Sequence, residues 1–366
     1  MKNFLKMRNA IISRATFMRV KRKIISRVWV VRTLMLGVVV LVVSIVAVLS
    51  FFALRNTRFG NSIKIAQGFI KPNYENIKII DGRINILVLG KAGEGYDAPD
   101  LTDSLTVLSI DVDKKKTYLF SVPRDIWIEN LKTKINSLYY YGNKKTEGGG
   151  LVLAKNVVSE IMGIPIQYSL AIDFDGFKKI IDVLGGVDVQ VKNGFTDEKF
   201  PIPGKENDEC GGDTTFSCRY EKIAFEKGII HMNGETALKY SRSRHAEGDE
   251  GDDFARSARQ QEIFAAIKEK LLSKEILLNP KKIKNLLGVV NTAVERDFDD
   301  STAASISRYI YESRRSINQF GLDESLFDIV TGNPKYENLY VLVPKDDNWT
   351  AFQENIKCKL EIMVCN

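Results

Sequence analysis

The residues best suited to chemistry are arginines gathered in one short stretch of the chain. Arg242 and Arg244 lie two positions apart, so in an extended segment both side chains leave on the same face. Arg256, Arg259 and Gln260 are spaced as neighbours on one face of a helix. Repeated planar, permanently charged guanidinium groups suit an oxyanion with many acceptors, such as a phosphate or pyrophosphate. The alternative is a solvated surface whose arginines pair with nearby acids: Asp249, Glu250, Asp252 and Asp253.

An acidic loop is a second candidate for the same site. It carries Asp97, Asp100 and Asp103 between two apolar segments. Mg²⁺ is typically bound by one or two carboxylates together with substrate phosphate oxygens. Asp103 lies at the start of an apolar strand. A carboxylate is unusual in that position, which favours a functional role. Asp97 and Asp100 are equally compatible with a solvated loop.

Two basic residues complete the set. Arg124 follows a proline at the end of an expected strand, and ligands of α/β sheets bind beyond the carboxyl ends of strands. The alternative for Arg124 is an ion pair with Asp125. Lys134 is either a surface lysine or a further anion contact. The sequence lacks G-x-S-x-G, H-E-x-x-H and P-loop motifs and has only two histidines. The remaining chemistry is electrostatic, as in phosphoryl transfer.

The apolar pattern predicts an α/β fold. Short apolar segments indicate strands at 84–90, 104–110, 117–122, 168–174, 187–191 and 339–343. Helices are expected at 148–162, 175–184 with Asp175 as N-cap, 253–273 and 280–317, and a long loop at 192–221. This alternation favours a central mixed sheet with helices on both faces.

The N-terminal part of the chain predicts a membrane anchor. Residues 1–32 hold ten Lys or Arg and no acid, and the rest of the chain has 43 basic against 46 acidic residues. That balance argues against nucleic acid as a partner. Residues 33–54 carry no charge, and a helix of this length spans the roughly 30 Å hydrocarbon core. A cleaved signal peptide is the alternative, but it usually has a shorter apolar region. The basic tail places the N-terminus in the cytoplasm and the body outside.

The four cysteines have no metal-binding spacing. In an oxidising compartment they allow three disulfide connectivities, of which the local one pairs neighbours in sequence, and free thiols remain an alternative. The four are Cys210, Cys218, Cys358 and Cys365.

Six short segments in this order resemble the LytR–CpsA–Psr family of bacterial cell-wall enzymes. They are NILVLG at 85–90, LTDS at 101–104, SVPRD at 121–125, KIN at 134–136, YSRSRH at 240–245 and DFARSARQQ at 253–261. The resemblance implies an extracytoplasmic α/β domain in a single-pass protein of the cell membrane. It implies transfer of a glycopolymer from a polyprenyl-pyrophosphate carrier to peptidoglycan through a phosphodiester, with Mg²⁺ or Mn²⁺ at the pyrophosphate and the lipid in an apolar tunnel.

The resemblance also assigns roles to residues of this chain. Asp103 corresponds to a metal and pyrophosphate residue, and four arginines correspond to a pyrophosphate clamp: Arg124, Arg242, Arg244 and Arg256. Lys134, Arg259, Gln260 and Asp253 are expected to contact substrate, Asp253 also being a candidate general base. Many family members have an aspartate two residues after the first strand's glycine, where this chain has Ala92. We expect Asp97, or else Asp100, to supply the missing metal ligand.

The expected division follows from the anchor and the resemblance. It consists of a basic cytoplasmic tail at 1–32, a transmembrane helix at 33–54, a stalk at 55–82, a catalytic domain at 83–358 and a tail at 359–366. Within the domain we expect a core at 83–275 and a helical part at 276–358. The alternatives to a transferase are a hydrolase of the same lipid-linked substrate and a non-catalytic protein that anchors or regulates anionic polymers. A transcriptional attenuator is a further alternative, against which the short cytoplasmic tail argues.

Overall fold

The computed structural model describes residues 77–366, apart from 97, 206, 252, 322–323 and 365–366. These residues belong to one compact unit, Lys64–Asn366. The expected tail at 1–32, the transmembrane helix at 33–54 and most of the stalk lie outside the described residues. Within the described part, no helix has the length and apolarity needed to cross a membrane.

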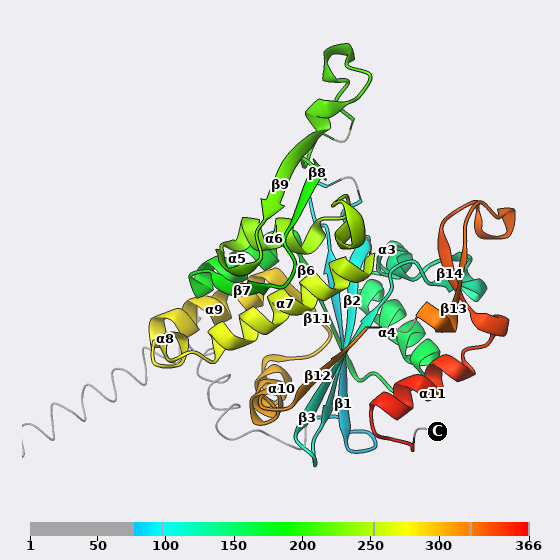
Figure 1. Ribbon diagram of the computed structural model, residues 1–366. Coiled ribbons are helices and arrows are strands. Elements are labelled where there is room, and N and C mark those ends of the chain that lie inside the picture. Colours follow the sequence, from blue (N-terminus) through cyan, green and yellow to red (C-terminus); the bar gives the residue numbers. More distant parts are fainter. Residues whose placement is uncertain (1–76, 97, 206, 252, 322–323, 365–366) are drawn as a thin grey trace, which may run out of the picture. The chain divides into compact units, whose positions relative to one another are not determined.

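The centre of the unit is a mixed six-stranded sheet, as predicted (Figure 1). Its order is β11-β6-β1-β2-β3-β12. β1 runs parallel to β6 and β3 parallel to β12, while the other neighbouring pairs are antiparallel. In chain order the strands are β1 (Arg83–Lys91), β2 (Thr102–Asp111), β3 (Lys116–Val122), β6 (Tyr168–Asp173), β11 (Val294–Arg296) and β12 (Ile317–Phe320).

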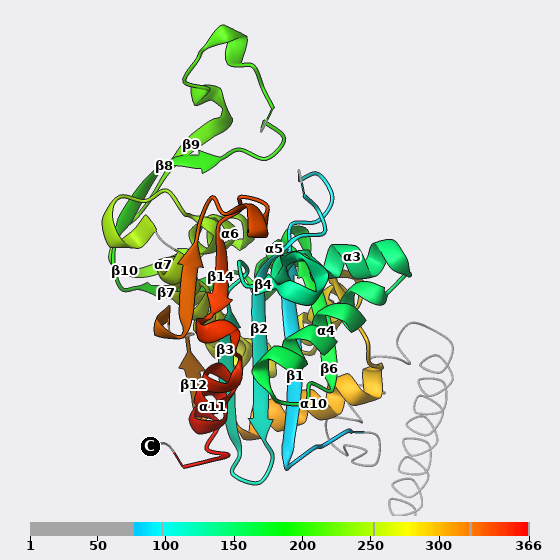
Figure 2. The same ribbon diagram turned by 90° about the vertical axis from the view of Figure 1, so that its right-hand side faces the viewer.

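Helices cover both faces of this sheet. Because side chains alternate along a strand, Leu105 and Val107 of β2 enter one apolar core and Leu108 enters another. The first core packs under α3 (Leu138–Lys145), α4 (Gly149–Met162) and α11 (Thr350–Lys359), as Figure 2 shows. The opposite face is covered by α5 (Phe174–Leu184), α7 (Asp253–Leu271) and α10 (Asp300–Glu312). The expected α/β architecture is therefore confirmed.

Helix α5 begins one residue earlier than the sequence predicts, and its N-cap lies two residues before the predicted one. Its N-cap is Asp173, whose side chain accepts a hydrogen bond from the Gly176 amide, and Asp175 lies inside the first turn. The N-cap role satisfies one of the amide groups that a helix start leaves without a backbone partner. Asp173 thereby becomes the last residue of β6, at the sheet edge where β1 also ends.

The C-terminal part at 276–358 is not wholly helical. The expected helix at 280–317 is broken into α9 (Pro280–Ala293) and α10, with β11 between them and β12 after them. A three-residue strand such as β11 is too short to show a period of two in sequence. β13 (Phe327–Val330) and β14 (Val341–Pro344) form a separate hairpin. The expected tail at 359–366 also begins inside the core, because Leu360 is fully buried and its carbonyl accepts a hydrogen bond from Arg83.

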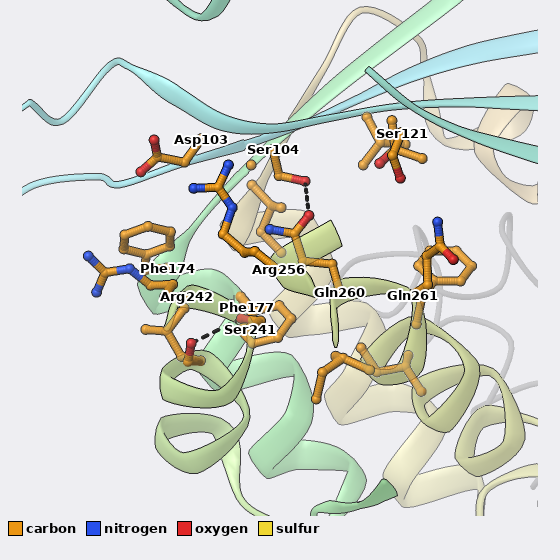
Figure 3. A pocket seen from close by; sticks show the side chains of 18 of the residues that line it. Asp103, Ser104, Ser121, Phe174, Phe177, Ser241, Arg242, Arg256, Gln260 and Gln261 are labelled. Carbon is orange, nitrogen blue, oxygen red and sulfur yellow. Dashed lines mark hydrogen bonds between the residues drawn. The ribbon is translucent and has the colours of Figure 1, made fainter. Parts of the chain in front are cut away.

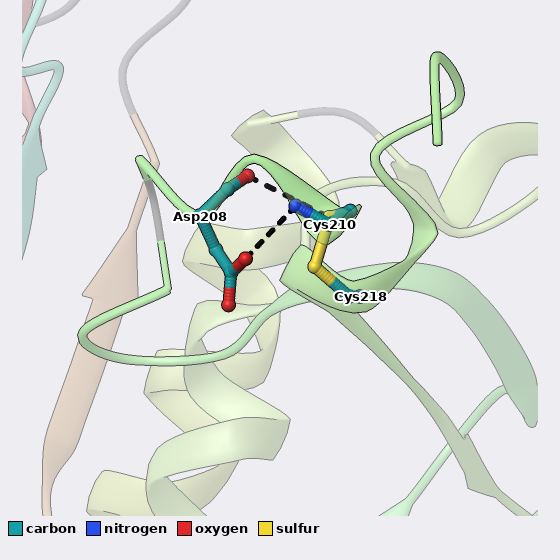
Figure 4. A group of neighbouring side chains, drawn as sticks. All are labelled: Asp208, Cys210 and Cys218. Atoms are coloured by element: carbon teal, nitrogen blue, oxygen red, sulfur yellow. Dashed lines mark hydrogen bonds between the residues drawn. A yellow bond between two sulfur atoms is a disulfide. The ribbon is translucent and has the colours of Figure 1, made fainter. Parts of the chain in front are cut away.

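Residues 192–221, expected to be a loop, form most of a projecting hairpin (Figure 1). Its strands are β8 (Phe195–Pro201) and β9 (Tyr220–Phe225). Cys210 and Cys218 form a disulfide near its tip, which confirms one of the local pairings (Figure 4). Asp208 lies beside them, but sulfur atoms joined in a disulfide are not thiolate ligands, so this group is no metal site. The other local pairing involves Cys365, which lies outside the described residues.

The remaining elements connect these parts. β7 pairs with β10, and β4 pairs with β5. Their bounds are β4 (Trp127–Ile128), β5 (Thr133–Lys134), β7 (Val187–Val191), β10 (Gly228–Met232), α6 (Gly234–Arg242) and α8 (Lys274–Leu277).

Candidate active site

A pocket of about 460 Å³ lies between the sheet and the helices α5, α6 and α7. Polar side chains cluster at the end where β1 stops and β2 starts. Figure 3 shows Asp103, Arg242 and Arg256 gathered there, whereas Ser121 and Gln261 lie away from them. The residues of the polar end are Asp103, Ser104, Arg242, Arg244, His245, Arg256 and Gln260.

The rest of the pocket is elongated and mainly apolar. Along β2 its wall extends from Asp103 to Leu108, roughly 16 Å at the rise of a strand. Along α7 it extends from Arg256 to Ile267, also roughly 16 Å at the rise of a helix. Two independent elements thus give the same length. The apolar wall is formed by Val88, Leu108, Leu119, Ile172, Phe177, Ile180, Leu238, Ile263, Phe264 and Ile267.

Asp103 and Arg124, which are 21 positions apart in sequence, form an ion pair. A guanidinium nitrogen of Arg124 lies 2.5 Å from a carboxylate oxygen of Asp103, whose side chain is 37% exposed. Arg124 also lies 3.4 Å from the buried Asp125, and Lys134 donates a 2.7 Å hydrogen bond to that same carboxylate. Lys134 therefore reaches the site through Asp125 and Arg124. Neither Arg124 nor Lys134 is part of the pocket wall itself.

Two residues of α7 reach from the opposite side. Arg256 is buried and lines the pocket. Gln260, one turn further on, accepts a 3.2 Å hydrogen bond from the Ser104 hydroxyl (Figure 3). The helical spacing seen in the sequence therefore places both side chains at the polar end of the pocket, as expected.

Arg242 lies over aromatic rings. Its guanidinium carbon is 4.3 Å from the centre of the Phe174 ring, with Tyr96 and Phe200 at 5.4 and 5.7 Å. Such contacts attract a cation through the ring quadrupole and fix its position. No local sequence pattern indicates this group of rings around Arg242, because the rings come from three separate segments.

Arg259 has a different role from the predicted one. It is 2% exposed and does not line the pocket. Its guanidinium donates to the backbone carbonyls of Tyr240, Ser243 and Glu250 and to the Glu250 carboxylate. Burial lowers the pKa of this guanidinium, and Glu250 opposes the effect. At three residues from Arg256 the side chain is rotated around the helix toward α6, so it holds the arginine stretch in place.

Asp197, on β8, is a site residue that the sequence did not reveal. It is fully buried and accepts hydrogen bonds from the Ser243 hydroxyl and from the amides of Arg244 and His245. Burial raises the pKa of its carboxyl, but these donors and the Lys199 amide outweigh burial and hold the pKa below its usual value. The turn that carries Arg242 and Arg244 is thus held from two sides, by Asp197 and by Arg259.

The acidic loop supplies one described carboxylate to the pocket wall. Asp103 lines the pocket, whereas Asp100 forms an ion pair with Lys91 at 3.2 Å. Asp97 lies outside the described residues, as does the side chain of Asp253. Asp173 also lines the pocket, from the end of β6. Ala92 is 8% exposed and packs in an apolar cluster with Phe174 and Leu238.

These donors fit a divalent cation only in part. Among the described residues, no three acidic, histidine or cysteine ligand atoms come together at the pocket. Mg²⁺ usually takes one or two carboxylates and completes its shell with water and substrate phosphates. The exposed carboxylate of Asp103 meets that minimum requirement. A site built from it depends on the anion of the substrate for the remaining ligands.

Comparison with known proteins identifies the family. The sequence profile of the LytR_cpsA_psr family matches residues 59–357. The chain belongs to this family. Its curated relatives include the polyisoprenyl-teichoic acid–peptidoglycan teichoic acid transferase TagV of Bacillus subtilis, 34% identical over 50% of this chain and 42% of TagV. The regulatory protein MsrR of Staphylococcus aureus is 30% identical over 58% of this chain and 57% of MsrR. The chain thus spans about half the length of these curated relatives.

Solved structures of LytR–CpsA–Psr proteins share the fold. The crystal structure of B. subtilis TagV matches with a TM-score of 0.54 at 25% identity, covering 77% of this chain and 99% of that one. A structure described as TagT bound to LI-WTA matches with a TM-score of 0.51 at 19% identity, covering 79% of this chain and 96% of that one. The second likeness concerns the fold alone.

Proposed function

We propose that this LytR–CpsA–Psr protein is a phosphotransferase that moves a glycopolymer from a polyprenyl-pyrophosphate carrier onto peptidoglycan through a phosphodiester bond. The observation that carries the proposal is an elongated, mainly apolar pocket that ends in arginines. An apolar chain with a multiply charged oxyanion at one end complements both parts of this cavity. The description of TagV as a polyisoprenyl-teichoic acid–peptidoglycan teichoic acid transferase names the same class of substrate and acceptor.

In the proposed reaction, a hydroxyl of a wall sugar attacks the phosphorus that carries the glycopolymer. A phosphorus–oxygen bond forms to that hydroxyl, and the bond to the polyprenyl phosphate breaks. Arg242, Arg244 and Arg256 bind the pyrophosphate and stabilise the negative charge that builds on the departing phosphate. Arg124 orients Asp103 beside them. The proton of the hydroxyl passes to water or to an ionised carboxylate at the pocket mouth.

A divalent cation, Mg²⁺ or Mn²⁺, would be held by Asp103 with Asp97 as the second carboxylate. When bound, it would neutralise charge on the phosphates. The chain's own residues supply the rest: the arginines bind the anion, Gln260 and Ser104 shape its pocket, and the apolar wall excludes water from the lipid. We further propose that residues 33–54 anchor the protein in the cell membrane with the catalytic domain outside.

The test uses residues 64–366, the compact unit that contains every described core residue. The purified unit is analysed by mass spectrometry for co-purifying polyprenyl phosphate or pyrophosphate. It is then incubated with a synthetic lipid-linked glycopolymer, with and without peptidoglycan. We expect polymer joined to peptidoglycan and free polyprenyl phosphate, and loss of both products in Arg256→Ala.

The same experiment separates the alternatives. Release of free polymer at an equal rate without peptidoglycan would identify a hydrolase. Absence of co-purifying lipid, together with no binding of added polyprenyl pyrophosphate, would overturn the proposal and favour a non-catalytic binding protein.

A further inference from the structure

A basic surface lies where the pocket's helix ends. The segment from the end of α7 to the middle of α9 contains six lysines and only two acidic residues, Glu269 and Glu275. The chain after residue 32 is slightly acidic as a whole. We call these lysines the α7–α9 basic surface: Lys268, Lys270, Lys274, Lys281, Lys282 and Lys284.

One of the two glutamates is already neutralised by its neighbours. Glu275 binds Lys270 at 2.7 Å and also binds Lys282. Hydrogen bonds from these two lysines lower the pKa of Glu275 to about 2, so it stays ionised and bound to them. Lys274, Lys281 and Lys284 are exposed, and the last two share one face of α9 because they are three residues apart. The surface therefore presents net positive charge to its surroundings.

An exposed apolar side chain lies within the α7–α9 basic surface. Leu278, between α8 and α9, is 76% exposed. A leucine this exposed gains little from folding, and the two helices that flank it carry the lysines Lys274, Lys281 and Lys284. Basic side chains around a projecting apolar one are typical of surfaces that rest on a bilayer, with the charge among anionic headgroups and the apolar group at the acyl boundary.

The surface also has a fixed relation to the pocket. Helix α7 lines the pocket from Arg256 to Ile267 and ends at Leu271. Helix α8 follows α7 directly (Figure 1). The arginines thus mark the start of α7, and the basic surface marks its end. Phe264, near this end, lines the pocket and is 41% exposed. The apolar part of the pocket therefore lies on the side of the basic surface.

We propose that the α7–α9 basic surface docks on anionic phospholipid headgroups and turns the apolar end of the pocket toward the bilayer. The partner is a lipid surface, because the surface combines charge with an exposed leucine; a free anionic polymer would need only the charge. The inference rests on the proposed location at the membrane, but not on the transfer reaction.

The test is vesicle co-sedimentation of residues 64–366, which omit the expected anchor. Vesicles of phosphatidylcholine alone are compared with equimolar phosphatidylcholine and phosphatidylglycerol. The surface variant carries Lys274→Gln, Lys281→Gln and Lys284→Gln. The matched control carries Lys199→Gln, Lys205→Gln and Lys227→Gln, three exposed lysines on and beside the projecting hairpin. A third variant, Leu278→Ser, removes only the apolar group.

The proposal expects binding to the anionic vesicles alone. The partition coefficient of the surface variant onto anionic vesicles should fall about tenfold or more, because each lysine near an anionic surface contributes measurably to binding. The control variant should keep most of the parent's binding. Leu278→Ser should weaken binding most at high salt, where charge is screened. Thermal unfolding of all variants should match the parent, since the replaced side chains are exposed.

Three results would overturn it. The first is no binding of the parent unit to phosphatidylglycerol vesicles. The second is equal loss in the surface and control variants. The third is binding to soluble poly(glycerol phosphate), lost in the surface variant, without vesicle binding, which would make a free polymer the partner. None of these readouts depends on transferase activity, so failure here is distinct from failure of the proposed reaction.

Discussion

Asp197 accepts a 2.7 Å hydrogen bond from Ser243, the residue between Arg242 and Arg244. The two residues are 46 positions apart in sequence, and Asp197 belongs to the hairpin strand β8. The carboxylate also receives the amides of Arg244 and His245. The direction of two pocket arginines therefore depends on a buried anion outside the pocket wall.

Replacing Asp197 with asparagine should lower both stability and transfer. The amide NH₂ group would face backbone and hydroxyl donors, and leaving buried donors unpaired costs about 1–3 kcal/mol. Because the folded-state pKa of Asp197 is lowered, its contribution is present above the unfolded pKa of about 3.9 and is lost as pH falls through the folded pKa. Urea unfolding should show the largest difference between parent and variant near pH 7 and a smaller one below pH 4.

The matched control is Glu198→Gln on the same strand. Glu198 is exposed and pairs with Lys222, so its loss should change stability little. A difference between parent and Asp197→Asn that stays constant down to the lowest pH, or that equals the control, would contradict the prediction.

Substitutions of Arg256 and Arg259 should have different effects, although both residues lie on α7. Replacing Arg259 should lower stability, and replacing Arg256 should lower affinity for the substrate. Arg259→Met removes the cation bound to three carbonyls and Glu250. Breaking a buried charged network typically costs about 3–5 kcal/mol, so the temperature of thermal unfolding should fall markedly. Arg256→Met should instead reduce affinity for a short polyprenyl pyrophosphate at least about tenfold, because charged hydrogen bonds contribute about 1.5–3 kcal/mol.

Calorimetric titration with farnesyl pyrophosphate and thermal unfolding of both variants provide the measurement. Arg259→Lys keeps the charge but cannot reproduce the fork of donors, so it should remain less stable than the parent. If Arg259→Met lost affinity without losing stability, Arg259 would be a substrate-binding residue and the prediction would be wrong.

Introducing aspartate at Ala92 tests the position where many family members carry one. Ala92 lies in an apolar cluster with Phe174 and Leu238. An unpaired carboxylate there should lower the unfolding temperature, because burying a charge without a partner is costly. Added Mg²⁺ or Mn²⁺ should restore part of the loss if the new carboxylate and Asp103 bind one ion.

Ala92→Ser is the control, since it adds a polar group without charge and should not respond to the ion.

Asp97→Ala in the parent should raise the Mg²⁺ concentration needed for transfer. Unchanged metal dependence in Asp97→Ala would exclude Asp97 as the substitute ligand.

The sequence determined the features that depend on local spacing. Short apolar segments predicted the strands β1, β2 and β3, and the spacing of apolar residues predicted the helices α4 and α7, because burial of a strand or of one helix face leaves a direct trace in the chain. The spacing of Arg256 and Gln260 placed both at one end of a pocket for the same reason. Asp103 was singled out because a carboxylate at the start of a buried strand is unusual, and the structure places it on the pocket wall.

The tertiary structure decided which charged residues face the pocket. The sequence put Arg259 with Arg256 and Gln260, but a rotation of three residues around α7 turns Arg259 toward Tyr240 and Ser243. Lys134 meets Asp125 rather than the pocket wall. Asp197 and the rings around Arg242 come from distant segments, and no local pattern marks a contact across such separations. Periodicity shows which residues share a face, and only packing shows what that face meets.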